Sequence, residues 1–179
     1  PDDQLFSPTV FDDVAFGPLN MGYSDDMVKM RVKKALKEIK MEGYEGRCPH
    51  HLSFGEKKRI CIATVLSMVP EVLILDEPTS NLDPMARRDM IRLFHNLHLT
   101  KIIATHDMEM ATEVCNRVIL LFQGKVVADG DTREILTDEK LLEKHGLEPP
   151  PLVRIFKYMG HEDFPLTMDE VEKIYSCSK

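Results

Sequence analysis

The sequence lacks the features that define several large classes of protein. It has 30 Asp and Glu residues against 23 Lys and Arg residues, so its formal net charge is −7. Since nucleic-acid-binding domains carry a basic surface, we expect no nucleic-acid partner. No apolar run reaches the ~18 residues of a membrane-spanning helix. The four cysteines are scattered, without a C-x-x-C pair, and are expected to be reduced thiols.

A further absence concerns phosphate binding. The sequence contains no G-x-x-x-x-G-K-[ST] run, the loop whose N–H groups and lysine cradle nucleotide phosphates. Residues 17–24 have the glycine spacing of such a loop, but Tyr23 stands where its lysine belongs, Pro18 removes a donor, and no strand precedes the stretch. We therefore reject this stretch as a phosphate loop. The chain begins at Pro1 rather than at Met, so we expect it to be part of a longer protein.

The apolar pattern predicts a helical half followed by an α/β half. Residues 1–23 are rich in Pro and Gly and are expected to be mostly loop. Helices are expected at 24–41, 54–69, 84–97 and 108–115, strands at 72–75 and 101–105, and a hairpin at 118–128 around Gln123–Lys125. Apolar strands joined by helices favour a mostly parallel sheet that is covered on both faces. Three prolines at 149–151 precede a small helical extension. Residues 1–70, 71–147 and 148–179 are thus the expected parts.

Two adjacent carboxylates end the first predicted strand, in the stretch VLILDEPTSNLDP. Asp76 and Glu77 are therefore expected at the carboxyl edge of a parallel sheet, where open α/β sheets bind ligands. A strand-end Asp can help hold Mg²⁺, and the next Glu is suited to polarise an attacking water. A solvated strand end is the alternative, which the apolar run before the pair and Pro78-Thr79 after it disfavour.

Other candidate residues have strong structural alternatives. His106 ends the next strand in IIATHD, where it can contact a phosphate or face solvent. Ser53 and Glu56 in LSFGEKKR form a capping box, and the same helix start, with Gly55, can bind an anion.

The basic residues 57–59 of this helix are expected to form a solvated face rather than a phosphate clamp. Asp83 before Pro84 is suited to cap a helix, and Gln4 is by itself an ordinary polar residue. The run CPHH at 48–51 resembles half a metal site, but no second ligand pair follows at a usable spacing, so metal binding there is disfavoured.

In this order, PDDQLF, LSFGEKKR, VLILDEP, SNLD and IIATHD resemble the Q-loop, signature, Walker B, D-loop and switch-histidine segments of ABC transporter ATP-binding subunits. The resemblance covers residues 1 to about 147. It looks closest to the energy-coupling-factor branch, and within it to the cobalt/nickel importer ATPases. It implies an α/β, P-loop NTPase-like fold, here a helical subdomain plus the C-terminal part of the sheet. The adenine-stacking aromatic and the phosphate loop of the family would precede Pro1.

The resemblance also implies roles for the matching residues. Glu77 would be the catalytic base, and His106 would hold the γ-phosphate. Asp76 and Gln4 would place Mg²⁺, with Gln4 relaying the state of the ATP. Further ATP contacts would be made across a dimer by four residues: Ser53, Gly55, Glu56 and Asp83. The usual signature is Leu-Ser-Gly-Gly-Gln, so Phe54 limits backbone freedom here and Glu56 adds an anion.

The resemblance implies an ATPase that energises import, with ATP and Mg²⁺ as cofactors, at the cytoplasmic face of the membrane. Residues of about 7–50 would dock on a membrane coupling protein, which works with a substrate-binding membrane subunit and a second ATPase subunit. Cobalt or nickel is the expected substrate. A vitamin importer, a soluble ABC-type ATPase of DNA repair or translation, and an interaction module without activity are the alternatives. We expect this chain alone to bind nucleotide weakly and to lack activity.

Overall fold

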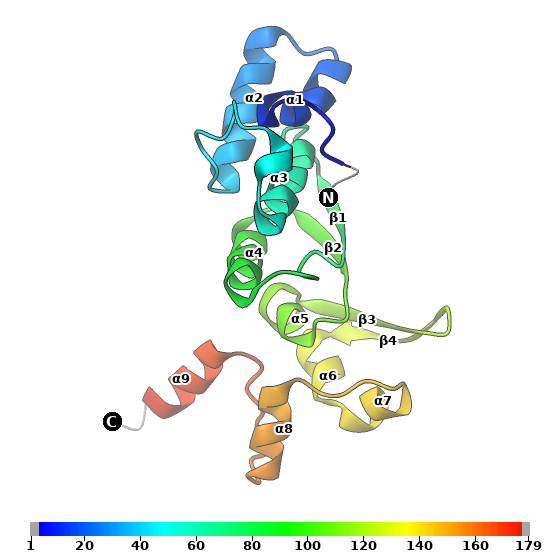
Figure 1. Ribbon diagram of the computed structural model, residues 1–179. Coiled ribbons are helices and arrows are strands. Elements are labelled where there is room, and N and C mark those ends of the chain that lie inside the picture. The colour runs from blue at the N-terminus through cyan, green and yellow to red at the C-terminus, as the bar shows by residue number, and fades with distance from the viewer. Residues whose placement is uncertain (1–3, 177–179) are drawn as a thin grey trace. The chain divides into compact units, whose positions relative to one another are not determined.

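A computed structural model describes residues 4–176, which form an α/β structure (Figure 1). It consists of two compact units, and the division lies between Ala104 and Thr105. The first unit contains α1 (Val10–Asn20), α2 (Asp25–Glu38), the 3₁₀ turn η1 (Pro49–His51), α3 (Phe54–Leu66), β1 (Val72–Asp76), α4 (Pro84–Asn96) and β2 (Thr100–Ala104). The predicted α/β fold is confirmed. The division into 1–70, 71–147 and 148–179 stays a prediction.

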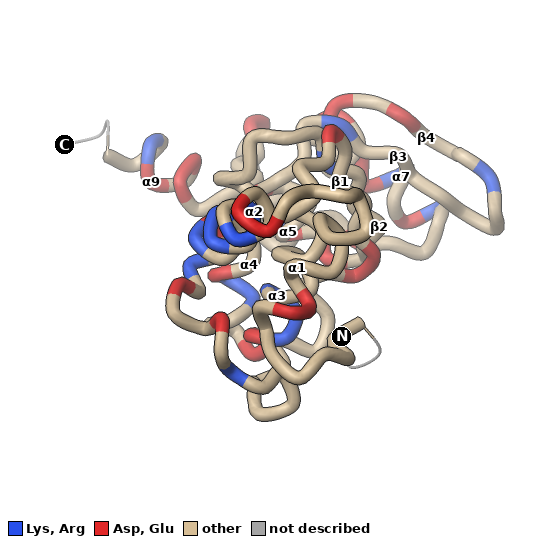
Figure 2. The backbone as a smooth tube through the Cα atoms, turned by 90° about the horizontal axis from the view of Figure 1, so that it is seen from above, with Lys and Arg blue, Asp and Glu red and all other residues tan. Residues whose placement is uncertain are grey.

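The core of the first unit lies between α1, α2 and α3, which pack against one another (Figure 1). Each helix contributes apolar residues at helical spacing to this core, and the side chains of Val14, Val32, Leu36 and Ile60 are fully buried. The other face of α2 is charged. Its lysines are exposed, and they concentrate positive charge along α2 (Figure 2).

Helix α1 corrects the expectation that residues 1–23 are mostly loop. Thr9 caps it by accepting a hydrogen bond from the backbone N–H of Asp12. Pro18 lies inside the helix and cannot donate to the carbonyl of Val14, which instead accepts a hydrogen bond of 2.8 Å from Ser67 Oγ. Gly17 allows close packing, because a Cβ there would lie 2.7 Å from Met68 Cγ and Sδ. Two apparent helix breakers are thus accommodated by residues about 50 positions later.

Helices α2 and α3 both end three residues before the predicted position. Helix α2 ends at Glu38 rather than at residue 41, and α3 ends at Leu66 rather than at residue 69. The cause is a residue in the left-handed region after each helix, Lys40 with φ 58° and Val69 with φ 56°. This conformation cannot continue a right-handed helix, and side chains other than glycine adopt it rarely.

Strands β1 and β2 form a parallel pair in which Ile74 lies opposite Ile102. This pairing confirms the parallel sheet, but the expectation of cover on both faces is wrong for the described residues. Leu73 is buried, whereas Ile74 is 75% exposed and Ile102 is 56% exposed. Side chains alternate between the two faces of a strand, and the described elements cover only one of them.

The second unit contains α5 (Met108–Val114), β3 (Arg117–Phe122), β4 (Lys125–Asp131), α6 (Thr132–Thr137), α7 (Glu139–Lys144), α8 (Pro151–Tyr158) and α9 (Met168–Ser176). The predicted hairpin is confirmed: β3 and β4 pair antiparallel around a turn at Gln123 and Gly124, both with positive φ. Arg133 at the start of α6 donates to the carbonyl of Phe164 (2.7 Å) and to Glu170 Oε1 (2.6 Å). The C-terminal extension is thus part of this unit.

Within residues 4–176, no helix is both long and apolar enough to cross a membrane. The described cysteines, Cys48, Cys61 and Cys115, form no disulfide, and Cys177 lies outside the described residues.

Candidate functional site

The turn after β1 carries the two predicted carboxylates. Asp76 is the last residue of β1, and its side chain is exposed at the carboxyl edge of the parallel pair. The N–H of Glu77 donates to the carbonyl of Ala104 at the end of β2 (2.9 Å). Glu77 has φ 44°, in the left-handed region, which costs on the order of 1–3 kcal/mol for a residue with a side chain. The surrounding structure must therefore hold this conformation.

Lys58 on α3 supplies much of that support. Its ammonium donates to the carbonyls of Glu77 (3.1 Å), Pro78 (3.1 Å) and Ser80 (2.7 Å). Ser80 Oγ also donates to the carbonyl of Glu77, at 2.8 Å. Burial lowers the pKa of Lys58, and the nearby charge of Glu77 partly opposes that shift. The expectation that Lys58 belongs to a solvated face is wrong, since its head group donates to three backbone carbonyls.

The start of α3 confirms the predicted capping box. Ser53 Oγ accepts from the N–H of Glu56 (3.3 Å), and Glu56 Oε2 accepts from the N–H of Ser53 (2.8 Å). Glu56 Oε1 also accepts from the hydroxyl of Tyr44 (2.8 Å). The hydrogen bond from the Ser53 N–H is the main cause that lowers the pKa of Glu56. The added anion of the signature is thus held against the helix start, where the helix dipole favours it.

Gly55 on α3 packs against the start of α4, which Asp83 caps. A Cβ on Gly55 would lie 3.1 Å from the Cβ of Ala86 and 3.7 Å from Leu82 Cδ2. Gly55 therefore permits close packing of α3 on α4, a reason that its sequence context did not reveal. Asp83 Oδ1 accepts from the N–H groups of Met85 and Ala86, at 2.9 Å each, and so caps α4 as expected.

Gln4 is exposed and precedes a short segment that Asp13 holds in place. Asp13 Oδ1 accepts from the N–H groups of Phe6 (3.1 Å) and Ser7 (3.0 Å), and the residue is only 3% exposed. Sequence reasoning missed Asp13. The available signal was an acidic pair in the first turn of a helix, but that helix was not recognised.

The structure places Gly55 on α3 beside Leu82 and Ala86, which flank Asp83 at the start of α4. Lys58 links α3 to the turn that carries Glu77. His106 follows β2 by two residues, belongs to the second unit and is exposed. Its role stays a prediction, as do the roles of the other site residues.

The chemistry of this region fits a magnesium nucleotide. Mg²⁺ is typically held through one or two carboxylates, with the remaining ligands supplied by phosphate oxygens and water. The exposed carboxylate of Asp76 provides such a ligand. Among residues 4–176, no group of three or more His, Cys, Asp or Glu side chains is placed to hold a metal ion.

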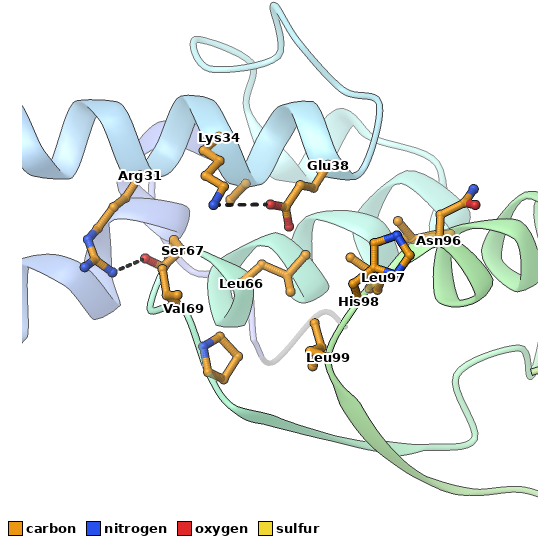
Figure 3. A pocket seen from close by; sticks show the side chains of 13 residues that line it. Arg31, Lys34, Glu38, Leu66, Ser67, Val69, Asn96, Leu97, His98 and Leu99 are labelled. Carbon is orange, nitrogen blue, oxygen red and sulfur yellow. Dashed lines mark hydrogen bonds and ion pairs between the residues drawn. The ribbon is translucent and has the colours of Figure 1, made fainter. Parts of the chain in front are cut away.

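A pocket of about 490 Å³ lies elsewhere in the first unit, between α2, the end of α3 and the α4–β2 connection (Figure 3). Arg31 borders it and donates to the carbonyl of Ser67 (3.2 Å), while Lys34 pairs with Glu38 across 3.9 Å (Figure 3). None of the predicted site residues lines this pocket, so it is not part of the candidate site.

Comparison with known proteins identifies the family. The family model described as ABC transporter matches residues 2–80. A putative ABC transporter ATP-binding protein of Geobacter sulfurreducens is 52% identical over 150 residues, 84% of this chain and 60% of that protein. The energy-coupling factor transporter ATP-binding protein EcfA of Methanococcus maripaludis is 46% identical over 166 residues, 91% of this chain and 60% of that protein.

A solved structure agrees with these relatives. CbiO1 of Clostridium perfringens, described as part of the ABC transporter complex cbiONQ, is 41% identical with a TM-score of 0.72. The match covers 90% of this chain and 64% of that one. The chain thus spans about three fifths of the length of its relatives. By sequence and by structure, the chain belongs to the family of ABC transporter ATP-binding proteins.

Proposed function

We propose that this chain carries the magnesium and water end of an ATP site, in a subunit that hydrolyses ATP to energise import across a membrane. The observation that carries the proposal is the arrangement of Asp76 and Glu77 at the carboxyl end of β1. The backbone of Glu77 is held on one side by β2 and on the other by Lys58 and Ser80. ATP and Mg²⁺ are the proposed cofactors.

Each residue has a distinct role in this proposal. Asp76 supplies a carboxylate oxygen to Mg²⁺, and Glu77 takes a proton from the attacking water. A base of this kind contributes typically ~10²–10⁴ to the rate. Gln4 contacts Mg²⁺ or the water, and His106 contacts the γ-phosphate.

A second ATPase subunit completes the proposed site. The start of α3 offers the hydroxyl of Ser53 and backbone N–H groups, a combination that binds phosphate. In the proposed dimer, Ser53 and Gly55 face the ATP of the opposite subunit, and Asp83 lies at the interface. The structure supports this role by placing these residues around the starts of α3 and α4, joined by the contact of Gly55 with Ala86.

The proposed membrane partner docks on α1 and α2. Exposed apolar side chains gather on these helices and their connection: Phe16, Leu19, Met21, Met27 and Met30. Helix α2 also carries exposed lysines, and Figure 2 shows Lys and Arg residues along it. Exposed apolar groups with a charged border are typical of protein interfaces. A coupling protein with apolar and acidic groups fits this surface and would place the chain at the cytoplasmic face of the membrane.

Cobalt or nickel ions are the proposed substrate, carried by a separate membrane subunit. The similarity to CbiO1 of the cbiONQ complex supports this substrate class. The similarity to EcfA proteins supports the energy-coupling-factor branch more generally, and a vitamin importer is the competing substrate class.

The test uses a chimera in which the residues that precede the match in the Methanococcus maripaludis relative are fused before this chain. ATP hydrolysis is measured with Glu77→Gln and with Glu71→Gln, the same change at an exposed residue that directly precedes β1. We expect Glu77→Gln to lower kcat by ~10²-fold or more while Mg-ATP binding is retained, because the neutral amide cannot accept the proton. Glu71→Gln should leave kcat unchanged. Equal turnover of Glu77→Gln and the parent chimera would remove Glu77 as the base.

Two further measurements address the remaining parts of the proposal. Calorimetric titration of the 179-residue chain with Mg-ATP should give weak or no binding, whereas micromolar binding would show that a phosphate loop is dispensable. Cobalt or nickel uptake should depend on the chimera when it replaces the ATPase of a metal importer. Copurification with nucleic acid instead of membrane subunits would favour a DNA-repair or translation ATPase.

A further inference from the structure

The structure directs the charged group of Lys58, on α3, into the turn after β1. Its three ammonium protons match three carbonyl acceptors, those of Glu77, Pro78 and Ser80, at 2.7–3.1 Å. The ring of Phe54 lies 5.4 Å from the same nitrogen. Because all three of its donors are used on backbone carbonyls, the ammonium of Lys58 stabilises the turn. The lysines along α2 are instead exposed.

The turn requires stabilising contacts from outside because its backbone is strained. Glu77 and Asn81 are both in the left-handed region, with φ 44° and 60°. The backbone–backbone hydrogen bonds within the turn are long, with Ser80 N–H to Glu77 carbonyl at 3.2 Å and Leu82 N–H to Thr79 carbonyl at 3.4 Å. Strained conformations persist only where surrounding contacts over-determine them. The contacts of Lys58 come from outside the turn and bridge both sides of it.

We propose that Lys58 is a positioning residue for Glu77. By holding three carbonyls of residues 77–80, it fixes the backbone from which the Glu77 side chain projects, and so the direction of that carboxylate. This inference rests on the proposed role of Glu77 as the base. Lys58 is also one turn beyond Gly55 on α3. In the proposed dimer, α3 therefore has two roles. Its start binds the phosphate of the ATP of the opposite subunit, and its Lys58 positions Glu77 at the ATP of its own subunit.

The first test measures the turn itself, by amide hydrogen exchange in the 179-residue chain. Lys58→Met keeps the stem without the charge, and Lys58→Arg keeps the charge. Lys140→Met on α7, an exposed lysine far in sequence, is the matched control. We expect Lys58→Met to lower the protection of the Ser80 and Leu82 amides about tenfold or more, because charged hydrogen bonds are lost. Lys58→Arg should restore part of it, and Lys140→Met should not change it. Protection within twofold of the parent in Lys58→Met would overturn the proposal.

A measurement on the parent chain covers the case in which Lys58→Met does not fold. An ammonium held by three acceptors exchanges its protons slowly, so the ¹⁵N-labelled chain should show a long-lived lysine ammonium signal that is missing in Lys58→Arg. Absence of that signal from the parent would also overturn the proposal.

The second test separates positioning from general stability, using the chimera. We expect Lys58→Met to lower kcat about tenfold to a hundredfold with the KM for ATP within twofold, and Lys58→Arg to recover part of kcat. If Glu77→Gln abolishes hydrolysis while Lys58→Met keeps the parent kcat, the inference about Lys58 fails and the proposed function stands. If the parent chimera does not hydrolyse ATP, the proposed function fails, and the exchange experiment still decides whether Lys58 holds the turn.

Discussion

The hydroxyl of Ser67 is predicted to stabilise the protein because it donates a hydrogen bond to the carbonyl of Val14. Pro18 has no N–H with which to make that hydrogen bond. The carbonyl of Val14 faces a position in α1 where a proline has no N–H, and Ser67 Oγ, which is buried, donates to it at 2.8 Å. Ser67→Ala leaves this carbonyl without its partner. An unsatisfied buried carbonyl costs about 1–3 kcal/mol, so we expect the free energy of unfolding to fall by about 2 kcal/mol.

The cause is tested by restoring the missing donor. Pro18→Ala places an N–H within α1, where it can donate to the carbonyl of Val14 as in an ordinary helix. If the carbonyl is what Ser67 serves, Pro18→Ala should make Ser67→Ala nearly harmless. The double-mutant cycle should then give a coupling of about 1–2 kcal/mol between residues 49 positions apart.

Urea unfolding followed by circular dichroism measures this cycle. With a slope of about 2 kcal/mol per M, the expected loss moves the midpoint by about 1 M. Ser24→Ala is the matched control, because Ser24 precedes α2 without a side-chain hydrogen bond to its backbone. It should change stability by less than about 0.5 kcal/mol. If Ser67→Ala costs the same with Pro18 as with Ala at that position, the compensation we describe does not exist.

Two more predictions concern the start of α3. Gly55→Ala should destabilise the chain by about 1 kcal/mol, because its Cβ would lie 3.1 Å from the Cβ of Ala86, and adding Ala86→Gly should restore the loss. Stabilisation by Gly55→Ala alone, as at an ordinary helical glycine, would contradict that contact. The second prediction concerns pH. Because the folded state lowers the pKa of Glu56 below its ordinary 4.5, its contribution is complete above pH 4.5 and is lost as pH falls through the lowered value. The stability difference between the parent and Glu56→Gln should therefore shrink over that range, and a constant difference would show that the charge of Glu56 is not involved.

The sequence predicted the elements whose determinants are local. An apolar run ending in two carboxylates is sufficient to place Asp76 and Glu77 at the end of β1. Ser53 with Glu56, and Asp83 before Pro84, are caps whose partners lie within three residues. Such signals survive in a single sequence because the interacting groups are neighbours along the chain.

The missed features depend on residues that are distant in sequence or on unusual backbone. Gly17 and Pro18 indicated a loop, but Met68 and Ser67 make both compatible with α1. The sequence around Lys58 does not indicate that its ammonium donates to three carbonyls about 20 positions later.

The departures from the usual signature become understandable through the same contacts. Phe54 replaces a glycine, but it is the first residue of α3 and does not adopt a positive φ, so its position does not require the freedom of glycine. Gly55 remains glycine because Ala86 leaves no room for a side chain. Glu56 replaces a glutamine, and its charge is directed back to the Ser53 N–H and the Tyr44 hydroxyl. In the proposed function, a phosphate that approaches α3 would share Ser53 with that carboxylate, because Ser53 and Glu56 are already hydrogen-bonded to each other.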